Sequence, residues 1–277
     1  MLKKFGFSTE SQDSPQRRSL NVLLIGESCY DEYHYGECLR LSPEAPVPVL
    51  DWKMGSVSPG MAANVERNLI ALGCSVKFIT NDPADLTKTR YVDKRSGHQL
   101  LRVDRGTGVK EPLSTRDYIV KGGRLSEINF SDYDVMIFSD YEKGFISHSM
   151  ALALCEDFDG PIFVDSKKTD LTCYPGAFIK INEFEEQDAL AFDDESEIIV
   201  TKGKEGATWK GKKFPAPKVD VYDVTGAGDV FLATLSYLYG NGNSISTSIE
   251  KAIQMASRSV QHSGTYQIQK WDIEEVL

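Results

Sequence analysis

The segment Asp223-Val-Thr-Gly-Ala-Gly-Asp229 leads directly into the apolar stretch Val-Phe-Leu-Ala-Thr-Leu-Ser-Tyr-Leu of residues 230–238. A glycine-rich turn that feeds an apolar helix leaves backbone N–H groups unpaired at the helix N-terminus. Together with the helix dipole, these donors favour an anion, above all the charge that develops on a transferred phosphoryl group. Asp229 would lie beside that anion, where it could accept a proton from an attacking hydroxyl. Because aspartate is also a favoured residue in a first helical turn, the segment alone leaves both interpretations open.

Short apolar runs alternate with helical stretches along the rest of the chain. Runs of strand length occupy residues 21–26, 76–80, 134–139, 161–165, 177–181 and 197–201. Stretches with apolar residues at helical spacing occupy residues 62–72, 147–158, 230–239 and 246–260. Buried strands that alternate with helices predict an α/β fold, with a mostly parallel sheet covered on both faces.

Two parts of the chain depart from this alternation. Residues 47–52, and residues 90–94 with 99–104, are extended pieces with alternating polar residues. They predict a small β-layer beside the main sheet, with ordinary surface hairpins as the alternative. We expect one domain over residues 21–277, with the β-layer near 36–58 and 88–106. Residues 1–20 are polar and lack the apolar centre of a secretory signal, so they predict a flexible N-terminal arm.

Charge and cysteine content argue against several classes of protein. With 277 residues and a formal net charge of −10, the chain lacks the basic surface that non-specific nucleic-acid binding requires. No apolar run reaches the length of a membrane span. The five cysteines are scattered without a CxxC pair, which indicates reduced thiols in a cytoplasmic protein rather than a zinc site or disulfides.

Two rival nucleotide-binding motifs do not fit. No GxGxxG follows the first apolar run, so the fingerprint of a dinucleotide-binding oxidoreductase is missing. Residues 206–212 have the spacing of a phosphate-binding P-loop. However, Lys213 stands where Ser or Thr would hold magnesium, and Phe214-Pro215 follows where a helix must start. We therefore interpret this segment as a hairpin turn.

A series of longer motifs occurs in a fixed order. They are Gly26-Glu-Ser-Cys-Tyr-Asp-Glu-Tyr-His-Tyr-Gly36, Arg40-Leu-Ser-Pro-Glu-Ala-Pro-Val-Pro-Val49, Ala62-Ala-Asn-Val65, Gln99-Leu-Leu-Arg-Val-Asp104, Ser139-Asp-Tyr-Glu-Lys-Gly144, Val164-Asp-Ser-Lys167, Asn182-Glu-Phe-Glu185, Val200-Thr-Lys-Gly203 and Val224-Thr-Gly-Ala-Gly-Asp229. On these motifs the chain, over residues 21–268, resembles the ribokinase-like (PfkB) carbohydrate kinases. The stretch at residues 40–49 makes it most similar to the bacterial D-glycero-β-D-manno-heptose-7-phosphate kinases.

The resemblance implies a ribokinase-like three-layer sandwich, with a mostly parallel central sheet and a small β lid. It also implies ATP as phosphate donor, Mg²⁺ as its metal and a sugar phosphate as acceptor. Asp229 would be the base that activates the sugar hydroxyl. Gly226, Ala227 and Gly228 would form the anion hole for the transferred group.

The same resemblance implies the binding residues around this centre. Asn182 and Glu185 would position magnesium and the phosphates, with Glu185 acting through a metal-bound water. Thr201, Gly203 and Thr225 would lie along the ATP. The sugar would be hydrogen-bonded by Asp31, Gly60, Asn64 and Asp140, and its phosphate held by Arg102 or Lys143. Without the resemblance, Asn64 could be a cap and Lys143 a solvated charge.

The implied reaction is attack of the anomeric hydroxyl of heptose 7-phosphate on ATP, which gives the 1,7-bisphosphate and ADP. The lid would close over the sugar and exclude water. Lids of this kind contribute to dimer interfaces in the family, so a homodimer through the lid is expected. The chain ends soon after the kinase part, so we expect the kinase step without a fused nucleotidyltransferase domain.

Three departures from the family pattern bear on the acceptor. Met61 replaces the second of two glycines before the Ala-Ala-Asn helix, which could alter hinge motion or the shape of the sugar site. Only nine residues separate Thr80 from Arg90, and residues 182–200 leave room for about one short helix. Two alternatives therefore stay open: a kinase for another sugar or sugar phosphate, and a trimmed, non-catalytic binding protein.

Overall fold

The computed structural model describes residues 18–113, 128–192 and 197–277, so residues 1–17 of the predicted N-terminal arm lie outside the described residues. Within these ranges the larger of two sheets has eight strands, in the order β12-β11-β10-β9-β8-β7-β1-β4. They are β1 (Asn21–Gly26), β4 (Ser75–Ile79), β7 (Val135–Asp140), β8 (Ile162–Ser166), β9 (Phe178–Asn182), β10 (Glu197–Thr201), β11 (Ala207–Trp209) and β12 (Lys212–Phe214).

The strands from β4 to β10 in this order pair in parallel, and β11 and β12 extend the sheet as an antiparallel hairpin. The predicted mostly parallel sheet is confirmed. Strand β1 shows why its sequence is apolar throughout. Val22 and Leu24 pack into one hydrophobic cluster, and Leu23 and Ile25 pack into another, because the sheet is covered on both faces.

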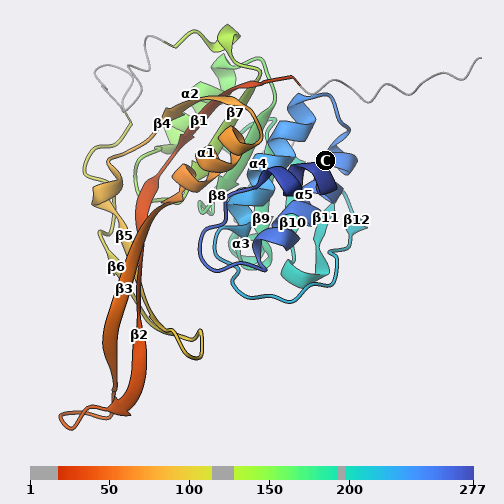
Figure 1. Ribbon diagram of the computed structural model, residues 1–277. Coiled ribbons are helices and arrows are strands. Elements are labelled where there is room, and N and C mark those ends of the chain that lie inside the picture. The colour runs from red at the N-terminus through yellow and green to blue at the C-terminus, as the bar shows by residue number, and fades with distance from the viewer. Residues whose placement is uncertain (1–17, 114–127, 193–196) are drawn as a thin grey trace, which may run out of the picture.

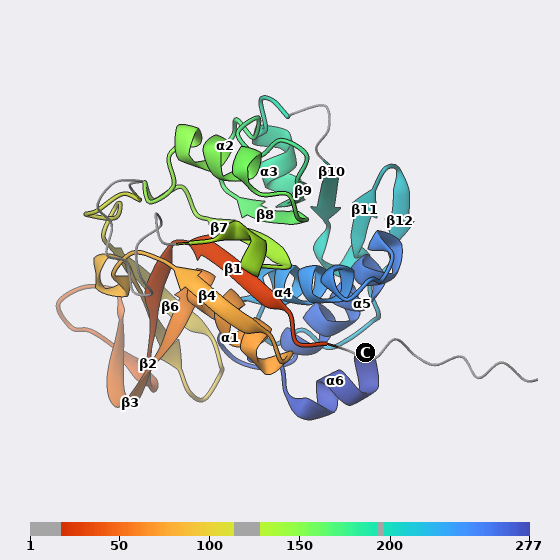
Figure 2. The same ribbon diagram turned by 90° about the horizontal axis from the view of Figure 1, so that it is seen from above.

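Helices form the two outer layers (Figure 2). On one face lie α1 (Ala62–Ala71), α4 (Ala227–Gly240), α5 (Ile245–Ser259) and α6 (Lys270–Val276), and on the other α2 (His148–Asp157) and α3 (Glu183–Asp188). Short 3₁₀ helices, η1 (Pro83–Asp85), η3 (Phe130–Asp132) and η4 (Gly203–Glu205), lie in the connections. Every helix in the described part of the chain is too short or too polar to cross a membrane. Helix α4 begins three residues earlier than the predicted 230–239, so Asp229 lies in its first turn.

A second sheet of four strands, in the order β3-β2-β5-β6, extends away from this body (Figure 1). Its strands are β2 (Ser28–Leu41), β3 (Pro48–Met61), β5 (Thr87–Asp93) and β6 (Gln99–Arg105). The extended pieces expected at 47–52, 90–94 and 99–104 fall in β3, β5 and β6. The long strand β2 was not expected as a strand. Its buried side chains alternate, but the charged Asp31 stands between Cys29 and Tyr33 on that side and breaks the apolar pattern of a strand.

Met61 joins the second sheet to the body, because it is the last residue of β3 and the residue before α1. Its φ of 58° and ψ of −133° lie in a region that residues other than glycine rarely adopt. This is the position where the resembling family has glycine, and the backbone conformation gives the physical reason for that glycine. The Met61 side chain is buried against Cys29 and Leu86.

Candidate active site

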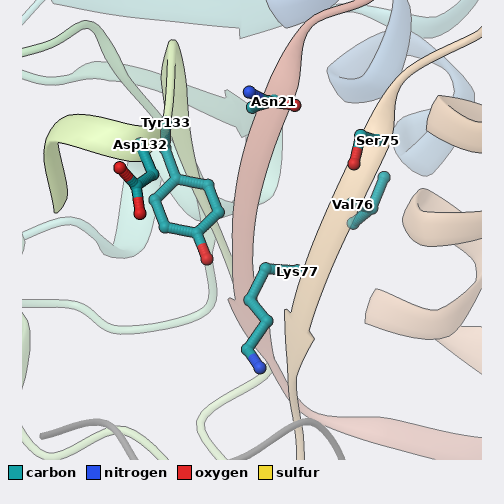
Figure 3. Close-up of a pocket in the computed structure, with 6 residues that line it drawn as sticks. All are labelled: Asn21, Ser75, Val76, Lys77, Asp132 and Tyr133. Atoms are coloured by element: carbon teal, nitrogen blue, oxygen red, sulfur yellow. The ribbon is translucent and has the colours of Figure 1, made fainter. Parts of the chain in front are cut away.

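The glycine-rich turn lies at the end of the large sheet where its parallel strands terminate. Gly228 at the start of α4 faces Lys180, in the middle of β9, and Asp165, the second-last residue of β8. Open parallel sheets place ligand sites at the carboxyl ends of their strands. A separate pocket of ≈ 310 Å³ lies around the first residues of β1 and β4 instead (Figure 3). Because those residues begin the strands, we do not assign this pocket to the site.

The turn has the backbone geometry that the sequence predicts for an anion site. Gly226 has a φ of 79°, and a Cβ at this position would lie 2.7 Å from the Nδ2 atom of Asn64. Glycine is therefore required at position 226 for two reasons: it adopts the left-handed conformation, and it leaves space for the Asn64 side chain. No side chain caps α4, although the N–H of Ala227 donates to the carbonyl of Val224 at 3.3 Å. The first turn of α4 can thus direct amides and the helix dipole at a phosphoryl group.

Asp229 is held by two hydrogen bonds, one to each carboxylate oxygen. The Nδ2 of Asn64 donates to Oδ2 at 2.9 Å, and the hydroxyl of Tyr141 donates to Oδ1 at 2.9 Å. Only 5% of Asp229 is exposed. Burial raises the pKa of Asp229 to about 6, against the opposing effect of the hydrogen bond from Asn64. A carboxylate with this pKa is mostly ionised at pH 7 and is a stronger base than an exposed aspartate.

A buried ion pair lies beneath the turn. The Nζ of Lys180 lies 2.7 Å from the Oδ2 of Asp165, and both side chains are buried. A Cβ on Gly228 would lie 2.9 Å from the Lys180 ammonium, so glycine allows this cation to approach the start of α4. Although burial alone would raise it, Lys180 holds the pKa of Asp165 below its usual range.

Asn182 and Glu185 form a reciprocal cap at the start of α3. The Oδ1 of Asn182 accepts from the amides of Phe184 and Glu185, and the Oε2 of Glu185 accepts from the amide of Asn182. The other oxygen of Glu185 pairs with the ammonium of Lys167. The spacing that suggested a nucleotide and magnesium site therefore also has a structural role.

Asn182 and Glu185 could hold a magnesium ion only through its water, because their side-chain oxygens are bonded within the chain. Among the residues described, no three His, Cys, Asp or Glu side chains converge to hold a metal by themselves. Oxygen donors are nevertheless close together, because Lys167 lies between the carboxylates of Glu185 and Asp165. Within the described chain, the Oδ1 of Asp165 is buried without a hydrogen-bond partner. Magnesium bound through water needs only such outer oxygens.

The three residues expected along the ATP lie on connections around this end of the sheet. Thr201 ends β10 and donates its hydroxyl to the carbonyl of Ile181 at 3.2 Å. Gly203 begins η4, and no atom lies within 4 Å of the position that a Cβ would take there. The amide of Thr225 donates to Asp223 at 2.9 Å, which fixes the turn that precedes α4.

Asp31, the sharpest candidate for the sugar, is paired with Arg90 at 2.5 Å, and both side chains are buried. Gly60 leaves room for this ion pair because it has no side chain. A Cβ at Gly60 would lie 2.0 Å from the Oδ2 of Asp31, so any side chain there would displace the carboxylate. Asn64, the third candidate, is directed at Asp229 instead of capping α1.

Two other predicted sugar ligands, Asp140 and Arg102, have side chains that bind neighbouring residues, whereas Lys143 is held only through its backbone amide. Asp140 is fully buried, and its carboxylate binds the ammonium of Lys168, the hydroxyl of Tyr174 and the hydroxyl of Ser166. Arg102 is exposed and bonded to Asp104 on its own strand through two nitrogens, each at 2.6 Å. Lys143 follows β7 in the turn of residues 141–145, where its amide donates to Glu27 at 3.0 Å.

Four residues that contact this centre received no role from the sequence. Tyr141, Asp165 and Lys167 stood within the motifs, and Lys180 is a lysine inside the otherwise apolar strand β9. That lysine was the one available signal, because an ammonium within a buried strand requires a charged partner. The partners of the other three follow only from the tertiary structure: Tyr141 reaches Asp229 on α4, Asp165 pairs with Lys180 of β9, and Lys167 pairs with Glu185 of α3.

A comparison with known families matches residues 176–272 to the pfkB family of carbohydrate kinases. The matched range contains both the cap at 182–185 and the turn at 226–229. The chain therefore carries a pfkB family carbohydrate kinase domain. Because the matched range contains Asp229 and none of the residues around the pocket of Figure 3, we take the Asp229 centre as the candidate active site.

Curated relatives extend the match over most of the chain. The bifunctional protein HldE of a Nitratiruptor species is 31% identical over 267 residues, which are 81% of this chain and 58% of that protein. HldE of Photobacterium profundum is 30% identical over 315 residues, 95% of this chain and 64% of the relative. The chain therefore spans about three fifths of the length of these relatives.

Solved structures confirm the ribokinase-like fold. Ribokinase from Thermotoga maritima matches with a TM-score of 0.65 at 17% identity, over 92% of this chain and 98% of that chain. Phosphofructokinase-2 from Escherichia coli, in complex with potassium, matches with a TM-score of 0.68 at 14% identity, over 93% and 98%. Identities this low concern the fold alone.

Proposed function

We propose that the protein is an ATP-dependent kinase that phosphorylates the anomeric hydroxyl of a sugar phosphate. The acceptor proposed is D-glycero-D-manno-heptose 7-phosphate, with the 1,7-bisphosphate and ADP as products. The observation that carries the proposal is Asp229, a buried carboxylate with a pKa of about 6 in the first turn of a helix that opens with Gly-Ala-Gly. The choice of heptose rests on the resemblance of residues 40–49 to the heptose kinases.

The residues of the turn would perform the transfer together. Asp229 would take the proton of the anomeric hydroxyl while the hydroxyl oxygen forms its bond to the γ-phosphorus. The bond from that phosphorus to the bridging oxygen then breaks, and ADP leaves. Backbone amides at Gly226, Ala227 and Gly228 would hold the negative charge on the transferred group.

The nucleotide side of the proposal places ATP across the ends of β8 to β10. Magnesium, when bound with ATP, neutralises phosphate charge. Asn182 and Glu185 would hold it through water, and Lys167 and Lys180 would add positive charge beside the phosphates. The nucleotide would extend along Thr201, Gly203 and Thr225. Because ATP is the donor, we also propose that the reaction takes place in the cytoplasm.

Lys88 is a further cation, in addition to the predicted Lys143, that fits the phosphate already present on the acceptor. It lies on the same face of the second sheet as Asp31 and Asp104, its direct neighbours in β2 and β6. The guanidinium of Arg102 already occupies Asp104. The Nζ of Lys88 lies 5.0 Å from the centre of the Tyr141 ring, and no carboxylate of the described chain forms an ion pair with it. A half-buried cation without a carboxylate partner favours an anionic ligand.

Steady-state assays of ADP formation with Mg-ATP would test the proposal on heptose 7-phosphate, fructose 6-phosphate and ribose. We expect turnover on the heptose phosphate, and a fall in kcat of about 10³-fold in Asp229→Asn because the base is lost. Asp220→Asn, an exposed change nine residues earlier, serves as the matched control. Activity on another acceptor alone would overturn the heptose assignment. Magnesium-dependent turnover that survives Asp229→Asn would overturn the role of the turn.

A further inference from the structure

Glu27 is a buried carboxylate that the proposed reaction does not use. It lies between β1 and β2 with no exposed surface. Its carboxylate accepts three backbone hydrogen bonds from the turn of residues 141–145, the Tyr141 turn: Tyr141 N at 2.6 Å, Lys143 N at 3.0 Å and Phe145 N at 3.1 Å. In the part of the chain that the structure describes, no lysine, arginine or histidine forms an ion pair with Glu27.

The Tyr141 turn has a backbone shape that fits an anion. Glu142 has a φ of 54° and Gly144 a φ of 89°, so left-handed residues alternate with the three donors. Such alternation directs successive amides toward one point and forms an anion-binding concavity. A left-handed conformation is unfavourable for glutamate, so the turn needs a partner that stabilises it. Here the partner is the carboxylate of Glu27.

The turn that Glu27 holds delivers one of the two hydrogen bonds to Asp229. That bond comes from the hydroxyl of Tyr141, the first residue of the turn. The other bond comes from Asn64 on α1. The backbone carbonyl of Glu27 accepts from the amide of Ala62, the first residue of α1, at 2.9 Å. One residue therefore fixes the base of both arms that reach Asp229.

We propose that Glu27 is a positioning residue, whose carboxylate fixes the Tyr141 turn and whose carbonyl fixes the start of α1, so that both hydrogen bonds to Asp229 are formed before substrate binds. The inference depends on the proposed function only for the role of Asp229 as base. The hydrogen-bond relay itself is a property of the folded chain.

The charges around Asp229 determine the direction of the expected effect. Burial raises the pKa of Asp229, and Asp165 raises it further, whereas Asn64, Tyr141 and Lys180 lower it. Loss of the Tyr141 hydrogen bond therefore raises the pKa of Asp229. The charge that acts on Glu27 itself is that of Asp140, which adds to the effect of burial in raising the pKa of Glu27.

Glu27→Gln tests the relay with little change in shape. One Gln oxygen can keep the bonds to Lys143 and Phe145, but the amide group then places a donor against the donor of Tyr141. The pKa of Asp229 is measured by ¹³C NMR titration of the full chain labelled at aspartate, assigned with Asp229→Asn. The same titration is made on Tyr141→Phe and on the double variant. Glu142→Gln, an exposed change within the same turn, is the matched control.

We expect each single variant to raise the pKa of Asp229 by about one unit, and the double variant to raise it no more than the larger single shift. The acidic limb of kcat/KM should move to higher pH in step. An unchanged pKa in Glu27→Gln beside a raised one in Tyr141→Phe would overturn the inference, as would shifts that add in full. Since the titration needs no turnover, an inactive protein would contradict the proposed function without affecting this result.

A second variant covers the case in which Glu27→Gln does not fold. Gly144→Ala strains the turn through its φ of 89°, while the added Cβ meets no atom within 4 Å. It therefore weakens the turn without removing any contact of Glu27. We expect the pKa of Asp229 to rise in this variant as well. A folded Gly144→Ala protein with an unshifted Asp229 contradicts the relay.

Discussion

At the scale of single residues, the protonation of Asp229 should appear in the rate. With a pKa of about 6, the carboxylate is ionised above pH 6 and protonated below it. We expect kcat/KM to be level near pH 7 to 8 and to fall about tenfold per unit below pH 6, because only the ionised form accepts a proton. A pH profile over pH 4.5 to 8.5 (roughly the stable range of most proteins) checks this. A plateau that continues to pH 5 would contradict the raised pKa.

The same carboxylate should also affect stability, but there the protonated form of Asp229 is the favourable one, whereas the rate needs the ionised form. The pKa of Asp229 in the folded protein lies above that of an unfolded aspartate, so folding favours the protonated form. This contribution is present below the unfolded pKa and is lost as the pH rises through about 6. Asp229→Asn should therefore gain stability relative to wild type, by about 1 kcal/mol more at pH 8 than at pH 5. Urea unfolding at the two pH values measures the difference.

Met61 offers a second test at this scale. Glycine is normally less stable than alanine by about 0.5–1 kcal/mol, but at a φ of 58° the order should reverse. Both replacements remove the buried Met61 side chain beyond its Cβ, so they differ mainly in the backbone conformations that the new residue can adopt. We expect Met61→Gly to unfold at a higher urea concentration than Met61→Ala. Equal midpoints, or a higher midpoint for Met61→Ala, would show that the backbone at Met61 is not strained.

At the scale of elements, the two faces of the second sheet have different roles. On the face directed at the body, the guanidinium of Arg90 pairs with Asp31 and that of Arg102 with Asp104. We propose Lys88, on this same face, as a cation for the acceptor phosphate. The alternation of side chains in β2, β5 and β6 places Glu32 and Thr89 on the opposite face.

Lys88→Met should raise the KM for a phosphorylated acceptor by about 10–100-fold, since a charge-assisted contact is worth roughly 1.5–3 kcal/mol. The KM for ATP should not change, because Lys88 lies on the acceptor side. The assay compares the sugar phosphate with the same sugar without its phosphate. Arg102→Met is the control, because the guanidinium of Arg102 is already hydrogen-bonded to Asp104. A raised KM in the control and not in Lys88→Met would return the phosphate to Arg102.

At the scale of the whole molecule, the outward face of the second sheet gives the expected homodimer a surface. Val57, Leu101 and Val103 on this face are exposed by 62%, 56% and 37%. Their register places them on the opposite side from Lys88. The same face carries the ion pair between Arg105 and Glu32 beside Val57. Its exposed apolar residues suit pairing with a second copy of the chain, which would bury both faces.

Val57→Asp combined with Leu101→Asp should convert the dimer into a monomer at concentrations of about 10 μM, since charges would be buried in the interface. Analytical ultracentrifugation of wild type and variant measures the change. Leu190→Asp, a change at an exposed leucine of the body, should leave the dimer intact. A wild-type protein that sediments as a monomer, or a dimer that survives the double change, would contradict this interface.

Much of the fold followed from local pattern. The parallel strands and helices α1, α2, α4 and α5 were predicted within a few residues, because buried strands and amphipathic helices each have a distinct apolar spacing. Strand β2 was missed because a charged residue, Asp31, stands between Cys29 and Tyr33 on its buried side. A charge at a buried position breaks the apolar alternation that identifies a strand.

The candidate site was only partly accessible from the chain order. The turn of 226–229 and Asn64 could be named from the sequence, since a glycine-rich helix start and a hydrogen-bonding asparagine are recognised from residue type alone. Arg102 and Asp140 were also named, but each is engaged by a neighbouring side chain. Motif spacing contains no information on such pairing, because an ion pair depends on which strands lie side by side.

By itself, the sequence determined the α/β class, the glycine turn with its aspartate and the departure at Met61, because these depend on local conformation and on the chemistry of single residues. Only the tertiary structure decided that Asn64 and Tyr141 reach Asp229, and that Glu27 holds the Tyr141 turn. The two partners of Asp229 lie 165 and 88 positions away from it along the chain. The 114 positions between Glu27 and Tyr141 are closed by the pairing of β1 with β7. The basicity of the proposed base therefore depends on packing that no local pattern encodes.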